Sequence, residues 1–202
     1  SKRITPKHDL GERPLRFNWQ TPIYLSRHQQ DVLYFGANKL YRSFDKGDNW
    51  EAISGELTTG GKPGNVPYGT LTTIHESPLK FGLLYTGSDD GLIYVSRDGA
   101  ENWNNISGQL PPNMWVSRVQ ASAHERGRVY ASLNGYRWDD FSSYVYVSEN
   151  YGQTWERSGL DLLVLLRFTP ALRVKTGEEF LQWLRDALHF SGVVVGYDFR
   201  FG

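Results

Sequence analysis

The sequence predicts an all-β fold built from three copies of one four-stranded unit. The first observation is an eight-residue motif that occurs three times, with its serines 53 and 52 positions apart (96−43 and 148−96). The second is a pair of strand-like segments in front of each copy. The third is composition, because 21 glycines and 14% aromatic residues suit many short strands joined by tight turns. The spacing is that of one four-stranded blade, so we predict a partial β-propeller of about three blades.

The repeated motifs, which we call the box turns, occupy residues 43–50, 96–103 and 148–155. We predict that each is a tight hairpin between the third and fourth strands of a blade. A carboxylate or amide accepts backbone N–H groups, a glycine supplies a positive φ, and the closing tryptophan buries its ring between sheets. The residues given this structural role are Ser43, Asp45, Gly47, Trp50, Ser96, Asp98, Trp103, Ser148, Asn150, Gly152 and Trp155.

The segments around the box turns repeat as well, which fixes the predicted limits of each blade. The predicted third strands are residues 39–42, 92–95 and 144–147, and the predicted second strands are residues 32–35, 83–86 and 128–131. After the first two box turns, residues 52–55 match residues 105–108. The predicted blades are residues 17–55, 66–108 and 115–158, inside a propeller region of residues 1–161.

Residues 162–202 depart from the repeat and are predicted to form an edge cap or an aberrant fourth blade. An apolar strand at residues 162–168 precedes a capping box at Thr176 to Glu179, a helix over residues 180–188 and a last strand at residues 193–201. Three blades do not close a ring, since propellers use about four or more. We expect one of three arrangements: the tail caps the open edge, the chain forms a homo-oligomer, or the sequence is a fragment that lacks further blades.

The pattern S-x-D-x-G-x-T/N-W of the box turns resembles the Asp-box of the bacterial-neuraminidase-repeat superfamily. That superfamily includes sialidases, xyloglucanases with tandem propellers and the sortilin-type receptor domain. Residues 66–72 and 115–118 are similar to sortilin-like repeat proteins of the exported bacterial type, which are often labelled glycosyl hydrolases. The resemblance implies a propeller fold and an exported location, periplasmic or extracellular.

A ligand site is predicted at the end of the blades opposite the box turns. The loops between second and third strands and the loops between blades should share that rim, where propeller ligands commonly bind. Residues 134–142 concentrate aromatic, cationic and acidic side chains there. The candidate ligand-binding residues are Tyr68, Trp115, Tyr136, Arg137, Trp138 and Asp139. The alternative is that Trp138 packs on a neighbouring blade and that the charges of this loop are merely solvated.

We therefore interpret the chain as a non-enzymatic binding or scaffold module that recognises a glycan or a polypeptide. The alternative is a glycoside hydrolase, sialidase-like or xyloglucanase-like, which needs two carboxylates about 5 to 9.5 Å apart. The candidate catalytic residues are Asp89, Asp90, Asp139 and Asp140. The arginine motif that sialidases carry near the first blade is not visible. A third hypothesis is an assembly factor that binds a folded partner through Trp115 and Trp138.

Composition excludes several other classes. The formal net charge is zero, which argues against a nucleic-acid partner. No run of about 18 apolar residues predicts a membrane span. There is no cysteine, so disulfides and thiolate metal sites are excluded, and the five histidines are scattered without ligand spacing. We expect neither a metal nor a cofactor.

Overall fold

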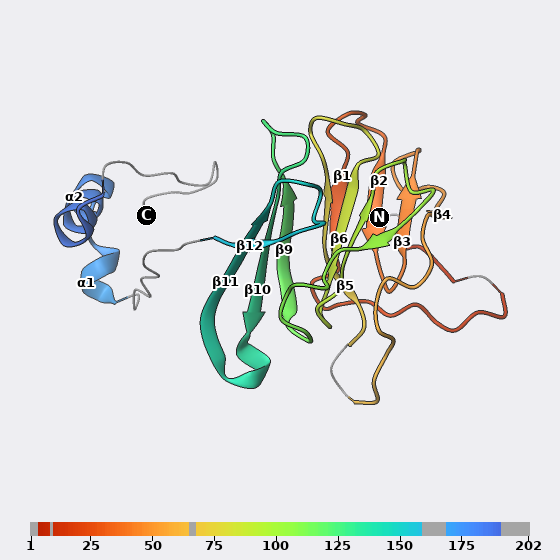
Figure 1. The fold of residues 1–202 in the computed structure, drawn as a ribbon, viewed down its shortest axis with the longest axis horizontal. Coiled ribbons are helices and arrows are strands. Elements are labelled where there is room, and N and C mark those ends of the chain that lie inside the picture. The colour runs from red at the N-terminus through yellow and green to blue at the C-terminus, as the bar shows by residue number, and fades with distance from the viewer. Residues whose placement is uncertain (1–3, 9, 65–67, 159–168, 191–202) are drawn as a thin grey trace. The chain divides into compact units, whose positions relative to one another are not determined.

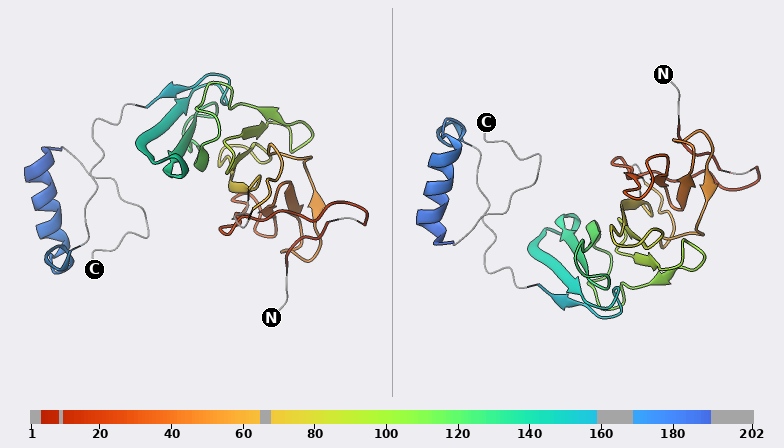
Figure 2. Two further views of the ribbon diagram at one scale, coloured as in Figure 1. Left: turned by 90° about the horizontal axis from the view of Figure 1, so that it is seen from below. Right: turned by 90° about the horizontal axis from the view of Figure 1, so that it is seen from above.

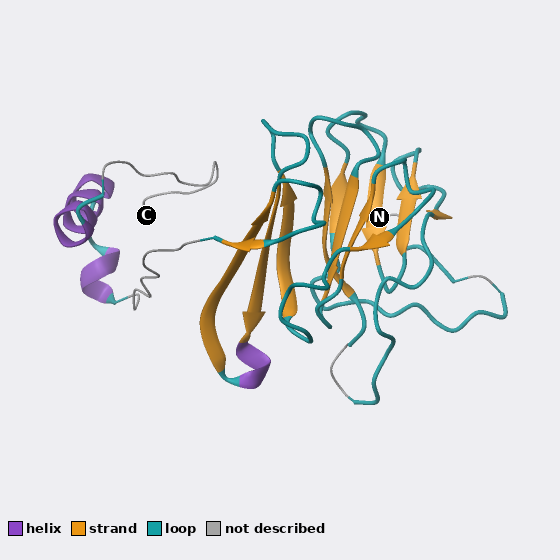
Figure 3. Cartoon of the chain, in the orientation of Figure 1, coloured by secondary structure: helices purple, strands orange, loops and turns teal. Residues whose placement is uncertain are grey.

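The computed structural model describes residues 4–8, 10–64, 68–158 and 169–190. Three four-stranded antiparallel sheets follow one another along the chain, and each is a simple meander (Figures 1 and 3). The strands are β1 (Ile23–Leu25), β2 (Leu33–Gly36), β3 (Leu40–Ser43) and β4 (Glu51–Ala52); β5 (Leu71–Glu76), β6 (Leu84–Ser88), β7 (Ile93–Ser96) and β8 (Asn104–Asn105); and β9 (Trp115–Ala121), β10 (Val129–Gly135), β11 (Asp140–Ser148) and β12 (Glu156–Arg157). The predicted all-β fold of three four-stranded blades is confirmed.

The hairpin between the first and second strands has the same geometry in every blade. The backbone N–H of the serine that follows the first strand donates to the carbonyl six residues later at 2.9 to 3.0 Å, and its hydroxyl accepts the N–H two residues later. These serines are Ser26, Ser77 and Ser122. A tyrosine lies eight positions after each of them: Tyr34, Tyr85 and Tyr130. The three blades can therefore be aligned residue by residue.

Each box turn is held by the same hydrogen bonds. In the first, the Ser43 hydroxyl donates to Asp45 Oδ1 at 2.7 Å and accepts the Gly47 N–H at 2.8 Å, while Asp45 Oδ1 accepts the Asn49 N–H at 2.8 Å. These bonds to the carboxylate lower the pKa of Asp45 to about 2. Each turn needs two consecutive residues of positive φ rather than the single glycine that the sequence suggested. The pairs are Lys46–Gly47, Gly99–Ala100 and Tyr151–Gly152.

The tryptophan that closes each box turn joins its blade to the chain in front of it. The indole N–H of Trp103 donates to the carbonyl of Ile53 at 2.9 Å, and that of Trp155 donates to Ile106 at 2.7 Å. Both isoleucines follow the fourth strand of the preceding blade. Trp50 makes the same bond, at 2.7 Å, to the carbonyl of Ile4. Ile4 therefore takes the place that Ile53 and Ile106 hold in the other two repeats.

The hydrophobic core lies between the sheets, because every blade buries apolar side chains against its neighbours. Figure 2 shows the three sheets succeeding one another in sequence order, and the first strands β5 and β9 contact the sheet in front of them. The core between the first two sheets includes Tyr34, Leu40, Leu71, Ile74 and Leu84. The core between the second and third sheets includes Tyr85, Ile93, Val116, Val119 and Leu133. Glycine at position 87 allows close approach, since a Cβ there would lie 2.5 Å from Val116 Cγ1.

The third blade differs from the prediction in its loop at residues 134–142. β10 continues to Gly135 and β11 begins at Asp140, so a 3₁₀ turn over Tyr136–Trp138 and Asp139 alone separate the strands. The register of β10 against β11 shifts between Leu133 and Gly135, as at a β-bulge. The ends of the predicted loop are therefore strand, because Asn134 pairs with Trp115 and Gly135 pairs with Asp140.

The C-terminal segment contains α1 (Pro170–Arg173) and α2 (Gly177–Leu188). The predicted capping box is present: the Thr176 hydroxyl accepts the Glu179 N–H at 3.2 Å, and the Glu179 carboxylate accepts the Thr176 N–H at 2.8 Å. Contacts divide the chain into a unit of residues 1–161 and a unit of residues 162–202. The strands expected at residues 162–168 and 193–201 lie outside the described residues. Of the helices that the structure describes, none is long and apolar enough to cross a membrane.

Candidate ligand-binding site

The antiparallel meander places two kinds of turn at opposite ends of each sheet. The box turns join third to fourth strands at one end, and the turns between second and third strands lie at the other. At this second end, which we call the loop face, the structure brings together Tyr68, Trp115, Tyr136 and Arg137. They come from the loop before β5, the start of β9 and the turn after β10. Residues far apart in sequence thus form one cluster.

Arg137 is the centre of this cluster. Its guanidinium carbon lies 4.7 Å from the ring centre of Trp115, 5.9 Å from that of Tyr68 and 6.0 Å from that of Tyr136. The rings of Trp115 and Tyr136 are 6.3 Å apart. Rings around a guanidinium hold it by cation–π attraction and fix its direction. About a fifth of the Arg137 side chain (22%) stays exposed to solvent.

A buried carboxylate lies beneath Arg137. Asp89 Oδ2 is 4.0 Å from the guanidinium, and the Asp89 carbonyl accepts a hydrogen bond of 3.5 Å from it. The carboxylate also accepts the backbone N–H groups of Gly69 and Thr70, both at 2.9 Å, and the Thr70 hydroxyl at 3.0 Å. Desolvation raises the pKa of Asp89, and the hydrogen bonds from Thr70 oppose that rise. Asp89 therefore ties the loop before β5 to the turn after β6.

Asp90, the other carboxylate of this turn, is also held by hydrogen bonds. Asp90 Oδ2 accepts the N–H and the hydroxyl of Thr59, both at 2.7 Å, and Oδ1 accepts the Ser88 hydroxyl at 2.5 Å. Asp89 and Asp90 are both buried, with their oxygens turned into these bonds. The catalytic role for these two residues stays a prediction to which this geometry adds no support, because their oxygens are buried and already hydrogen-bonded. Sequence reasoning placed them on the rim because it could not see which way the turn points.

The third blade supplies the exposed part of the loop face. Trp138 is 66% exposed, and its indole N–H donates to the carbonyl of Asn113 at 3.3 Å. Asp139 is exposed, in the left-handed region with φ of 55°. Asp140 accepts the Tyr144 hydroxyl at 2.5 Å and the Ser142 N–H at 2.9 Å, and these bonds lower its pKa. Asp140 thus stays ionised at neutral pH, unlike a general acid.

Two cations on the loop face were missed by sequence reasoning. The Lys62 ammonium lies 4.1 Å from the ring centre of Tyr68, the same ring that lies 5.9 Å from the Arg137 guanidinium. Arg16 donates to the Gly69 carbonyl at 3.1 Å and to Glu56 at 2.6 Å. Glu56 in turn accepts the Asn38 amide at 2.8 Å. No local pattern signals these contacts, because they join loops of two blades and the segment before β1.

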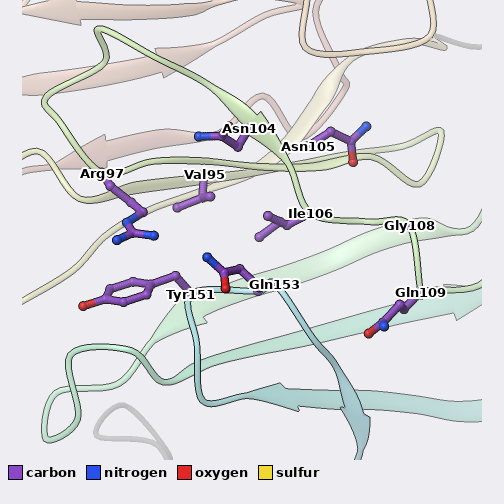
Figure 4. Close-up of a pocket in the computed structure, with 10 residues that line it drawn as sticks. Val95, Arg97, Asn104, Asn105, Ile106, Gly108, Gln109, Tyr151 and Gln153 are labelled. Atoms are coloured by element: carbon purple, nitrogen blue, oxygen red, sulfur yellow. The ribbon is translucent and has the colours of Figure 1, made fainter.

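A separate hollow of about 430 Å³ lies at the box-turn end, between the second and third blades (Figure 4). The Arg97 guanidinium sits 4.4 Å from the ring centre of Tyr151 on one side of it. On the other, Gln109 accepts the backbone N–H of Trp155 at 2.8 Å. These residues link the second and third blades beside the Ile106 carbonyl, which accepts the indole N–H of Trp155. The hollow is therefore distinct from the loop face.

Comparisons with known proteins agree on the class of fold. The structure is similar to the GH74 xyloglucanase of Xanthomonas campestris, with a TM-score of 0.50 and 18% identity, over 67% of this chain and 21% of that one. The GH74 enzyme of Niastella koreensis gives the same TM-score and identity, over 67% and 20%. At this identity the likeness concerns the fold alone. The chain has the fold of a β-propeller segment.

In sequence, the chain is similar to the vacuolar protein sorting/targeting protein 10 of Emericella nidulans. The two are 30% identical over 99 residues, which is 49% of this chain and 6% of that protein. The chain thus spans a small part of this relative and of the two enzymes. A likeness to a sortilin-like protein agrees with the resemblance that the box turns carry.

A family model described as FAD synthetase matches residues 148–202. The match begins at the third box turn and extends over the whole C-terminal unit, which is less than half of the chain. Most of the match falls on residues 162–202, whose pattern departs from the propeller repeat. The described part of that segment consists of α1 and α2.

Proposed function

We propose that the chain is a non-enzymatic binding module that recognises a glycan or a polypeptide on its loop face. The observation that carries this proposal is the cluster of three aromatic rings around Arg137, about a fifth of whose side chain is exposed. Aromatic faces stack on sugar rings or on peptide side chains, and an oriented guanidinium pairs with carboxylates. Lys62 adds a second cation beside Tyr68, so ligands with an acidic group are favoured.

The residues assigned to the ligand are Tyr68, Trp115, Tyr136, Arg137, Trp138 and Asp139. The exposed ring of Trp138 stands next to the cluster in sequence and is free to stack on a ligand. Asp89 has a supporting role, because it holds the loop of Gly69 and Thr70 in place and lies under Arg137. The third hypothesis, a folded protein partner bound through Trp115 and Trp138, uses the same surface and predicts that no free sugar binds.

The hydrolase alternative has less support. Of its four candidate carboxylates, Asp89 and Asp90 are buried and Asp140 is hydrogen-bonded to Tyr144. If the chain were a hydrolase, the wild-type protein would release reducing sugar from a polysaccharide such as xyloglucan, and Asp139→Asn or Asp140→Asn would abolish that release while leaving the melting temperature unchanged. We expect no release.

A glycan array and a peptide array, both screened with the wild-type chain, test the binding proposal. Trp138→Ala should weaken any hit by about tenfold or more, as removal of a stacking aromatic does. Phe44→Ala is the matched control, because Phe44 is an exposed ring at the box-turn end. Absence of hits on both arrays, or equal loss in both variants, would contradict the proposal.

We also propose that residues 162–202 form a unit separate from the propeller and contribute no blade. The division of contacts near residue 161 and the FAD synthetase match support this. Deletion of residues 162–202 should leave the ligand affinity of the loop face unchanged; a loss of affinity would show that the tail takes part. An exported location, periplasmic or extracellular, fits the resemblance of the box turns, and fractionation of the source cells would test it.

A further inference from the structure

One face of the third sheet is exposed where the same face of the first two sheets is covered. Tyr34 and Tyr85 have no exposed surface, whereas Tyr130, at the same position of the third blade, is 41% exposed. Tyr34 lies against the second sheet and donates to Glu76 at 2.8 Å. Around Tyr130 the face forms a hollow of about 450 Å³ whose lining includes Arg118, Gln120 and Ser132. In the unit of residues 1–161, no described strand covers this face.

On the complementary face of the first sheet only β1 is exposed, because Phe35 of β2 and Tyr41 of β3 are covered by the segment that contains Leu15 and Phe17. Ile23 and Leu25 of β1 are 51% and 62% exposed. The residues at these positions of the other first strands are buried against the preceding sheet: Ile74 and Glu76 in β5, and Val119 and Ala121 in β9. β1 therefore presents apolar side chains, as β9 does with Val119 and Ala121, although Leu25 stands where β5 has Glu76, the acceptor of the Tyr34 hydroxyl.

We propose that a second copy of this chain docks β1 onto the exposed face of the third sheet, with Ile23 and Leu25 against Tyr130 and Ser132. The chain forms this type of interface twice, between its first and second sheets and between its second and third sheets. The two surfaces that a third such interface needs are both present on the outside of the chain. Such a contact joins different faces of the two copies and either closes a ring or continues into a filament. Two copies of three blades would supply six, within the roughly 4 to 8 that propellers use, so we expect a closed dimer with two equal contacts.

Two features make this interface weaker than the internal ones. At the position of Ser132 the other blades have Gly36 and Gly87, where an added Cβ would crowd the next first strand. The serine side chain keeps a docking strand farther away. At the outer edge, Ser158 takes the place of Ile53, since its N–H donates to Val145 at 2.8 Å as that of Ile53 does to Leu40 at 2.9 Å. Ser158 would then compete with Ile4 for the Trp50 indole. The dimer should therefore be reversible.

Sedimentation velocity of the whole chain, at concentrations on the order of 1 to 100 µM, tests the proposal. The wild-type protein should shift from monomer to dimer as its concentration rises. Ser132→Arg and Leu25→Arg each place a charge in the contact and should weaken dimerisation by at least about a hundredfold, because the charge would be desolvated without a partner. Both side chains have room in the free chain, and circular dichroism checks that the variants fold. Leu10→Arg, at a fully exposed position in the segment before β1, is the matched control and should dimerise like wild type.

Mixing the two variants provides the decisive arm. Each variant keeps one intact face, so an equimolar mixture has one unaltered contact and should associate more strongly than either variant alone, though more weakly than wild type. A wild-type chain that stays monomeric over the whole range would overturn the proposal, as would variants that dimerise as well as wild type. A mixture of folded variants that associates no more strongly than either variant alone would overturn it as well.

Discussion

Removal of the Asp89 carboxylate tests whether this residue is structural rather than catalytic. Asp89→Ala leaves three donors without their acceptor: the backbone N–H groups of Gly69 and Thr70 and the Thr70 hydroxyl. Each buried donor left unpaired costs about 1 to 3 kcal/mol. Removal of a desolvated charge offsets part of this cost. We expect a net loss of about 3 kcal/mol in the free energy of unfolding.

Thermal unfolding and urea denaturation, followed by circular dichroism, measure this loss. For a unit of this size, about 3 kcal/mol corresponds to a fall in Tm of roughly 6 to 12 °C. Asp89→Asn keeps one acceptor oxygen and should fall between Asp89→Ala and wild type. Asp139→Asn is the control, because Asp139 is exposed and asparagine tolerates its left-handed φ. The reasoning fails if Asp89→Ala costs less than about 1 kcal/mol, or if it costs no more than the control.

Three further predictions concern the contacts between blades. Gly152→Ala should lower the free energy of unfolding by about 2 to 4 kcal/mol, because its Cβ would lie 2.3 Å from Ile106 Cδ1 at a φ of 87°. Gly108→Ala, with no neighbour within 4 Å, is the control and should be neutral, so equal melting temperatures of the two variants would contradict this prediction. Trp103→Phe should cost about 1 to 2 kcal/mol in urea denaturation, since Ile53 loses its donor; no measurable loss would show that this bond does not join the blades. Burial, followed by repulsion from Arg27 and Arg118, lowers the pKa of His75 to about 4 from 6.5, so its contribution to stability is present above about pH 6.5 and is lost as the pH falls toward 4. His75→Gln should remove that part of the pH dependence in melting experiments, and an unchanged profile would exclude His75 as its source.

The fold could be predicted because its signal repeats. The box turns recur at one spacing, and each needs the same serine, acceptor and tryptophan to satisfy the same backbone groups. The indole bond to the preceding blade has no sequence signature, since its partner is a backbone carbonyl. The sequence also does not reveal that each box turn needs two consecutive residues of positive φ. This need explains why Ala100 can stand where the other turns have glycine, with Gly99 in front of it.

The candidate site was predicted in part. Blade topology predicted that Tyr68, Trp115, Tyr136 and Arg137 share one rim. In the structure the three aromatic rings lie around the Arg137 guanidinium. The orientation of Asp89 and Asp90 was not predictable, because burial in a turn depends on the loop that folds over it. The long polar loop at residues 134–142 was overestimated for a similar reason: pairing across the sheet extends β10 and β11 into it.

The central claim is that ligands bind on the loop face through Arg137. The most direct test measures the affinity of the strongest array ligand for wild type, Arg137→Ala and Phe44→Ala by isothermal titration calorimetry. Arg137→Ala should weaken binding by roughly ten- to a hundredfold, since both the cation and the order of the surrounding rings are lost. Phe44→Ala should bind like wild type. Unchanged affinity in a folded Arg137→Ala variant, or a loss confined to Phe44→Ala, would contradict the account.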